Sequence, residues 1–160
     1  MSRWRASGGF TLIELIVTVA IVALLATAAM PVAQLAYKRA REQELSAALR
    51  NLRGAIDAYH EATVNGHVLV EAGASGYPPD LTVLVEGVVD AKDPAGRKLY
   101  FLRRLPRDPL FPDLSVPAEE TWGLRSYASP PDAPLPGDDV YDVRSLHPGV
   151  GLNGVAYAEW

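Results

Sequence analysis

The feature that most constrains this chain is an apolar run close to its N-terminus. From Phe10 to Tyr37 the chain has 28 residues and a single charged side chain, that of Glu14. A helix of about 20 apolar residues is long enough to cross the hydrocarbon core of a bilayer. Buried helices of soluble domains rarely stay uncharged over such a length. The run is therefore predicted to be a membrane-spanning helix.

A secretory signal peptide is the alternative interpretation of this run. Ala26-Thr27-Ala28 fits the small-residue pattern at which such signals are cleaved. The apolar run is longer than the roughly 7–15 residues that are usual in a signal peptide. This alternative would release a soluble secreted domain after Ala28, and it stays open at the level of the residues.

Glu14 is the residue that a simple membrane anchor does not explain. A charged side chain at the centre of a bilayer costs about 2.5–3.5 kcal/mol on insertion scales. Cleavage after Gly9 would place a new α-amine on Phe10, one helical turn from Glu14, in the first turn, where the helix dipole also favours an anion. In a polymer, the amine of one subunit could pair with Glu14 of the next subunit. That pairing would lower the cost of burial only when a neighbour is present.

Composition excludes several classes of function. The chain has no cysteine, which excludes disulfides, thiol catalysis and cysteine metal clusters. Its net charge of −4 gives no reason to expect nucleic acid as a partner. The histidines His60, His67 and His147 form no HExxH motif, and no phosphate-binding glycine loop is present. Ser126, Asp142 and His147 could be written as a triad, but no G-x-S-x-G elbow supports it. We expect no enzyme.

A helical pattern continues beyond the apolar run. Apolar residues recur at steps of three and four between charged residues, which predicts an amphipathic helix; they are Leu45, Leu49, Leu52, Ile56 and Tyr59. Asn65-Gly66 is a plausible stop. A helix from Phe10 to about Val64 would be roughly 80 Å long at about 1.5 Å per residue. Its second half should face a small domain of its own.

The remaining chain predicts short elements separated by proline and glycine. A short helix is expected at Leu81–Val85 with Asp80 as its cap, another turn at Arg97–Arg104, and loops at Leu110–Thr121 and Ser129–Asp139. β-forming residues in alternation predict three strands, at Trp122–Ala128, Val140–Ser145 and Val155–Trp160. We expect a three-stranded antiparallel sheet on the apolar stripe, and hence an α+β fold with a long N-terminal helix and loop-rich connections.

The segment Gly9-Phe10-Thr11-Leu12-Ile13-Glu14, followed by an apolar run, resembles the class III signal of type IV pilins and pseudopilins. The resemblance implies that a prepilin peptidase cuts after Gly9 and methylates Phe10, and that Glu14 is the assembly carboxylate. It also implies that the helix bends or locally unwinds at Pro31. A proline there removes one backbone hydrogen bond and clashes with the carbonyl of Thr27, which predicts a kink.

The same resemblance divides the chain into three parts. Residues 1–9 would be the leader peptide, residues 10–37 the transmembrane and polymerisation half of the helix, and residues 38–160 a periplasmic pilin domain that includes the helix to about residue 64. Basic residues flank the span on both sides, so charge counting does not orient it: Arg3, Arg5, Lys38, Arg39 and Arg41. The resemblance implies a single pass through the inner membrane with a cytoplasmic N-terminus.

Further segments narrow the resemblance to the major pseudopilins of type II secretion. They are Tyr77-Pro78, the run from Tyr100 to Pro109, Trp122-Gly123, the segment from Val140 to Ser145, and Trp160. This implies a periplasmic filament that drives protein secretion. The implied partners are further copies of the chain, other pseudopilins, prepilin peptidase and the inner-membrane assembly platform. The alternative is a subunit of a type IV pilus for adhesion, motility or DNA uptake.

Two features depart from that family. Leu110–Thr121 intervenes where Trp-Gly usually follows Asp-Pro almost directly. Those pseudopilins also bind calcium in the loop after the second strand, whereas residues 145–154 contain no acidic side chain. Calcium requires six to eight oxygen ligands, several of them carboxylates. The nearby Asp138, Asp139 and Asp142 are interpreted as solvated surface acids, so no cofactor and no calcium site of the family type is expected.

Charges of opposite sign are separated along the second half of the chain. The basic residues are Lys92, Arg97, Lys98, Arg103, Arg104 and Arg107, and the acidic ones are Asp132, Asp138, Asp139 and Asp142. They are either two solvated faces or surfaces that meet across neighbouring subunits and set their register. Arg103, Arg104, Asp138 and Asp139 are the candidates for such intersubunit contacts.

Overall fold

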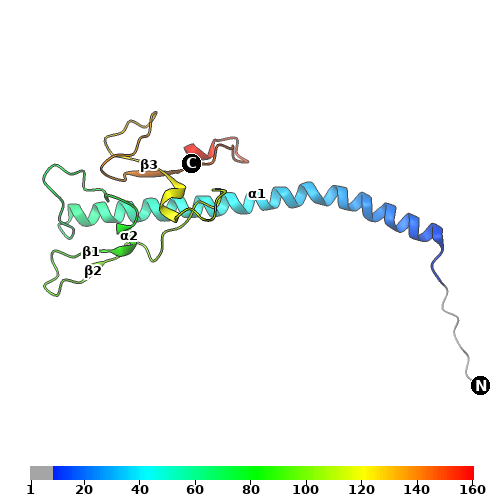
Figure 1. Ribbon diagram of the computed structural model, residues 1–160, viewed down its shortest axis with the longest axis horizontal. Coiled ribbons are helices and arrows are strands. Elements are labelled where there is room, and N and C mark those ends of the chain that lie inside the picture. Colours follow the sequence, from blue (N-terminus) through cyan, green and yellow to red (C-terminus); the bar gives the residue numbers. More distant parts are fainter. Residues whose placement is uncertain (1–8) are drawn as a thin grey trace, which may run out of the picture. The chain divides into compact units, whose positions relative to one another are not determined.

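The computed structural model describes residues 9–160, with the exception of the side chain of Ala28. The chain divides into a unit that ends at Ala40 and a unit from Arg41 to Trp160. Helix α1, Leu12–Val64, contributes residues to both (Figure 1). The fold is α+β, with a long N-terminal helix and small antiparallel sheets, as predicted. The predicted leader, residues 1–9, lies outside the described residues except for Gly9.

Helix α1 begins two residues after the predicted start and ends at the predicted residue. At its N-terminus, the Thr11 hydroxyl accepts a hydrogen bond from the N–H of Glu14 at 3.3 Å, as an N-cap side chain does. At its C-terminus, the N–H groups of Gly66 and His67 donate to the carbonyls of Thr63 and Ala62. Gly66 has a φ of 72°, the left-handed conformation of a Schellman cap. Asn65-Gly66 is therefore the helix stop.

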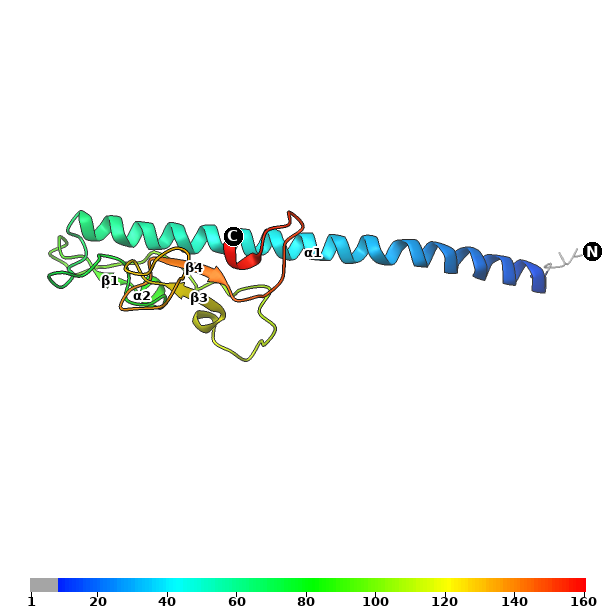
Figure 2. The ribbon, with the colours of Figure 1, turned by 90° about the horizontal axis from the view of Figure 1, so that it is seen from above.

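One face of α1 forms the wall of the core in the second unit. All five residues of the predicted stripe are buried, and α2 and both sheets lie beside this part of the helix (Figure 2). Ala48 and Ala55 of the helix also belong to the core. Its members from the segments that follow the helix include Leu81, Leu84, Trp122, Val140, Val143 and Tyr157. Burying a leucine or isoleucine side chain contributes about 1.5–3 kcal/mol. The stripe thus anchors everything that follows it in the chain.

The strands form two separate hairpin-like pairs instead of the predicted three-stranded sheet. Strands β1, Val88–Val89, and β2, Lys98–Leu99, pair antiparallel, with Val88 opposite Leu99. Strands β3, Trp122–Arg125, and β4, Asp142–Ser145, also pair antiparallel, with Trp122 opposite Ser145. Strand β3 is shorter than predicted because the next two N–H groups turn away, that of Ser126 to Leu135 and that of Tyr127 to Asp139.

The predicted third strand, Val155–Trp160, is wrong. The segment forms a single bridge between Val150 and Ala156 and then the 3₁₀ helix η2, Tyr157–Glu159. Gly154 has a φ of 82°, and the N–H of Gly151 donates to the carbonyl of Val155. The chain therefore turns back on itself, and it cannot extend along β4.

Other short elements differ from the predictions in detail. Helix α2, Val83–Glu86, begins two residues later than predicted, with the Asp80 carboxylate accepting from the N–H of Val83 at 2.9 Å. The turn predicted at Arg97–Arg104 is wrong, because this segment contains β2. The predicted loop Leu110–Thr121 is irregular until the 3₁₀ helix η1, Ala118–Thr121.

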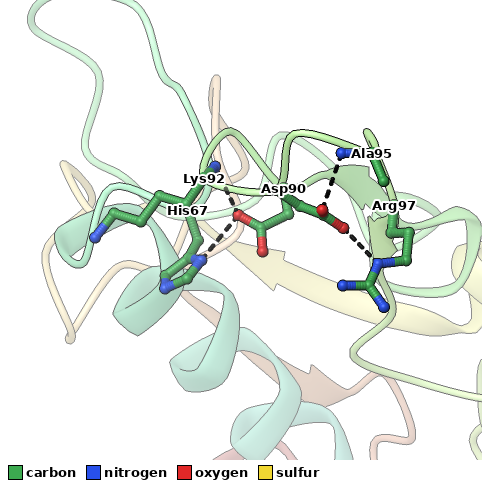
Figure 3. Close-up of polar contacts among 6 residues, drawn as sticks. His67, Asp90, Lys92, Ala95 and Arg97 are labelled. Atoms are coloured by element: carbon green, nitrogen blue, oxygen red, sulfur yellow. Dashed lines mark hydrogen bonds and ion pairs between the residues drawn. The ribbon is translucent and has the colours of Figure 1, made fainter.

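Two aspartates shape the turn between β1 and β2 (Figure 3). Asp90 accepts from the N–H of Lys92 at 2.9 Å and contacts His67 Nδ1 at 2.8 Å. These two bonds hold the pKa of Asp90 below its usual value. Asp93 pairs with Arg97 at 2.5 Å and accepts from the N–H of Ala95, and its pKa is lowered for the same reasons. The turn is thereby joined to the residues that cap α1.

A buried carboxylate connects the long loop to β4. Asp108 is 1% exposed. It accepts from the Ser145 hydroxyl at 2.6 Å and from the N–H of Leu110 at 2.7 Å, and its own N–H donates to the Thr121 hydroxyl. Nearby, the Trp122 indole donates to the carbonyl of Pro106. The Asp108-Pro109 segment is thus a structural anchor of the second unit.

We expect the substitution Asp108→Ala to lower the free energy of unfolding by about 2–4 kcal/mol, since it leaves the buried Ser145 hydroxyl and the partly buried N–H of Leu110 without an acceptor. Urea unfolding of the full chain in detergent measures the change. The control is Asp113→Ala, because the hydrogen bonds of the Asp113 side chain go to the exposed Ser115. Equal stabilities of the two variants would contradict the anchoring role of Asp108.

Candidate functional site

The helix of the N-terminal unit is apolar and its large apolar side chains are exposed. The most hydrophobic window of α1 has a mean hydropathy of 2.5, and none of it is buried. Phe10, Leu12 and Ile13 are 80%, 77% and 69% exposed. A contiguous apolar surface of this extent marks a site that contacts lipid or another protein. Its length and composition suit a membrane span, which no other helix in the described residues does.

Glu14 lies in the first turn of this helix, where it is surrounded by exposed apolar side chains. Within residues 9–160 no ion pair involves its carboxylate. The helix dipole and the free N–H groups of the first turn favour an anion at this position. Burial of Glu14 in lipid or in a helix bundle therefore calls for a cation from outside the described chain.

Gly9 and Phe10 precede α1 and are exposed. A Cβ atom built on Gly9 would meet no heavy atom of the described residues within 4 Å. Packing among residues 9–160 therefore sets no requirement for glycine at position 9. Gly9 and Phe10 are exposed, so this junction is accessible to a molecule that reads it.

The helix assignment runs through Pro31 without interruption. The helix surface is hollowed beside this proline, where Ala26, Thr27, Met30 and Gln34 line a shallow groove. The hydroxyl of Thr27 donates to the carbonyl of Leu24 at 2.7 Å, so this polar group is satisfied inside the helix. The kink predicted at Pro31 stays a prediction.

The structure separates the charged residues that the sequence grouped by sign. Arg97 pairs with Asp93, and Arg107 donates to the carbonyls of Asp113 and Val116. Asp142 pairs with Arg53 at 2.7 Å. The residues of the two groups that are exposed and make no hydrogen bond or ion pair to other described residues include Arg103, Arg104, Asp132 and Asp138.

Asp139, the remaining candidate, has partners within its own chain. Its carboxylate accepts from the N–H of Tyr127 at 2.8 Å. Partial burial opposes ionisation, but bonds from Ser75, Tyr127 and Ser126 hold the pKa of Asp139 below its usual value. This carboxylate orders the loop after β3, and it is less available to a neighbour than Asp138.

The three histidines lie in different surroundings. His60 stacks on Tyr77 with 4.2 Å between ring centroids, His67 contacts Asp90, and His147 packs edge-on against Tyr157. In the part of the chain that the structure describes, no group of three or more histidine and acidic side chains could hold a metal ion. No hydrogen bond there joins Ser126, Asp142 and His147 into a triad.

The sequence patterns did not single out two charged residues of α1 that form contacts with the C-terminal segment. Glu42 is buried and accepts hydrogen bonds from Tyr157 and Leu152. Arg53 donates to Asp142 and to the carbonyls of Val143 and Trp160. A signal was available for Glu42, because it precedes Leu45 by three residues and so lies on the buried face of the helix.

Residues 4–30 match the family model described as the prokaryotic N-terminal methylation motif. The matched segment includes the Gly9-Phe10 junction, Glu14 and most of the apolar run, and it leaves the second unit unmatched. No curated protein and no solved structure matches the chain.

Proposed function

We propose that the chain is a type IV pilin-like subunit, the class that the methylation motif indicates, and that prepilin peptidase processes it. The observation that carries the proposal is the uncovered apolar helix with its single charge, Glu14, four residues after Phe10. Such a helix is stable in a membrane, and it can equally be covered by the helices of other copies. The function is mechanical and involves no catalysis by this chain.

Assembly depends on the junction at Gly9-Phe10. Cleavage after Gly9 gives Phe10 an α-amine at the start of α1. In a filament this amine, methylated, pairs with Glu14 of a neighbouring subunit. The pair removes most of the cost of burying a lone carboxylate among apolar side chains. A subunit entering the filament therefore gains a partner for Glu14 that it lacks alone, which favours polymerisation over the isolated state.

Within this class, a pseudopilin of type II secretion is the subunit type that we propose. Asp108, Trp122 and β4 belong to the segments that resemble major pseudopilins, and they form a connected part of the second unit. The chain would sit once across the inner membrane with a cytoplasmic N-terminus. A cytoplasmic ATPase and the assembly platform would then move it into a periplasmic filament with other pseudopilins, and the growing filament would push secreted cargo through an outer-membrane channel. A type IV pilus subunit is the alternative.

The contacts between globular units of the filament would include the unpaired charges. Arg103 and Arg104 of one subunit would face Asp132 and Asp138 of a neighbour. Complementary charges set register and exclude wrong pairings more than they add affinity. This assignment replaces Asp139 with Asp132, because Asp139 is already bonded within its own chain.

The mature N-terminus tests the first step. In cells with the native processing machinery, mass spectrometry should find a chain that starts at N-methylated Phe10. A Gly9→Leu variant should keep Met1 and fold as the wild type does, since position 9 has no packing role. A chain that starts at Ala29 would lack Glu14, and it would establish the secreted-domain alternative instead.

Complementation of a gene deletion tests the role of Glu14 and the kind of filament. The deletion should abolish protein secretion, and the wild-type gene should restore it. Glu14→Gln should be inserted and processed but should restore at least tenfold less secretion, because a neutral side chain cannot pair with the amine. Glu44→Gln, at an exposed site, is the matched control. Normal secretion with lost surface fibres or twitching would favour the pilus subunit.

Charge reversal tests the intersubunit contacts. The double variant Arg103→Glu and Arg104→Glu should block filament formation, as seen by electron microscopy, while its thermal unfolding stays unchanged. Combining it with Asp132→Lys and Asp138→Lys should restore filaments. Lys92→Glu, in the exposed turn between β1 and β2, is the control. Normal filaments from the double variant, or no rescue by the reversed acids, would count against the contact.

A further inference from the structure

Glu42 is a carboxylate within the buried face of α1. Its residue is 8% exposed. Its Oε1 atom accepts hydrogen bonds from the Tyr157 hydroxyl and from the N–H of Leu152, each at 2.8 Å. Tyr157 is itself buried, and this burial, together with the Glu42 charge and bond, raises the pKa of Tyr157 to about 12. The tyrosine therefore stays protonated, and it remains a donor to Glu42 at any physiological pH.

The loop after β4 turns hydrogen-bond donors, not acceptors, toward its own side chains and toward α1. The N–H groups of His147, Gly149 and Val155 donate to side chains of the loop itself. The N–H of Leu152 donates to Glu42. A calcium site requires the opposite polarity, with six to eight oxygens converging on one point. Residues 145–154 contain no acid, and no acidic cluster able to hold a metal ion occurs within residues 9–160.

Two glycines of this loop are closely packed against neighbouring rings. A Cβ atom on Gly151 would lie 2.5 Å from Cζ2 of Trp160, and one on Gly149 would lie 2.7 Å from Cε1 of His147. The far end of the segment is held by Arg53, which donates to the carbonyls of Val143 and Trp160 at 3.0 and 2.7 Å. The segment 145–160 is thus held between two charged residues of α1, with Glu42 near its middle and Arg53 at its end.

We propose that Glu42 is the residue that fastens the C-terminal segment, residues 145–160, onto α1, and that this segment folds without a metal ion. The resemblance to major pseudopilins implies a calcium-binding loop at this place, and the residues present do not fit one. In this chain the Glu42 carboxylate of α1 accepts hydrogen bonds from donors of the C-terminal segment. A calcium ion at this place would instead require oxygen ligands from the loop. The inference concerns the folding of the second unit, and it does not depend on the filament function.

Thermal unfolding of the full chain in detergent, with calcium chloride or with EDTA, tests the first half of the inference. The midpoint should be the same in both, because no ion takes part in the native contacts. Limited proteolysis followed by mass spectrometry should show the segment equally protected in both conditions. A midpoint that falls with EDTA and returns with added calcium would overturn the proposal.

Substitutions at Glu42 test the second half. Glu42→Ala leaves the Leu152 N–H and the Tyr157 hydroxyl without an acceptor, so its midpoint should fall by on the order of 5–15 °C. Glu42→Gln keeps an acceptor, so its unfolding midpoint should fall less than that of Glu42→Ala. The control Glu44→Ala, at an exposed position one turn from Arg41, should unfold as the wild type does.

Tyr157→Phe covers the case in which Glu42→Ala fails to fold. It removes one of the two donors and leaves the ring packed against His147 and Trp160. We expect earlier proteolytic release of the C-terminal segment than in the wild type, with the Asp108 anchor still protected. If Glu42→Ala matches Glu44→Ala in its midpoint, or Tyr157→Phe matches the wild type in protection, Glu42 does not fasten the segment.

Discussion

The burial of one face of α1 between Leu45 and Tyr59 is the constraint on which the rest of the second unit depends. The strands that follow have two or four residues each, and sheets of that size are not stable on their own in water. They gain stability by covering the helix face. Polar anchors then fix where each segment lies, with Asp108 joining the long loop to β4 and with Glu42 and Arg53 holding the last residues. Apolar contact supplies the driving force, and these polar bonds supply the specificity.

The same helix meets a different requirement in the N-terminal unit. There its exposed side chains are mostly apolar, and no other part of the described chain covers its most hydrophobic window. Backbone groups inside a bilayer must be satisfied within the segment itself, and a continuous helix whose threonine hydroxyls bond its own carbonyls meets that demand. One helix thus passes from an environment that selects for uniform apolarity to one that selects for a single apolar face. Near Lys38 the sequence changes from mostly apolar residues to an apolar stripe between charged residues, in line with this change of environment.

How much the sequence predicts depends on how local the controlling contacts are. The C-terminal end of α1 follows from Asn65-Gly66 and its buried stripe from a 3.6-residue period, and both were confirmed. The segment Val155–Trp160 has β-forming residues, yet a backbone turn at Gly151–Val155 and the bonds to α1 decide its conformation. Grouping charges by sign likewise did not predict that Asp142 pairs with Arg53 from the distant helix. The residues from Gly9 to Glu14 could be singled out because the motif is contiguous, whereas Glu42 acts through residues more than a hundred positions away.

Gly9 is a glycine that packing among the described residues does not require. Most glycines that matter are kept by a left-handed backbone, as at Gly66, or by a close neighbour, as at Gly151. On the proposed function, the chain is therefore under two selections that do not overlap. One acts on the folded second unit and can be read from packing and hydrogen bonds. The other acts on the junction that the peptidase would cleave, so a screen for stable variants would accept almost any residue at position 9. Whether a substitution at position 9 is tolerated in a stability screen and whether it is tolerated in the cell are then separate questions. At this position the two would have opposite answers.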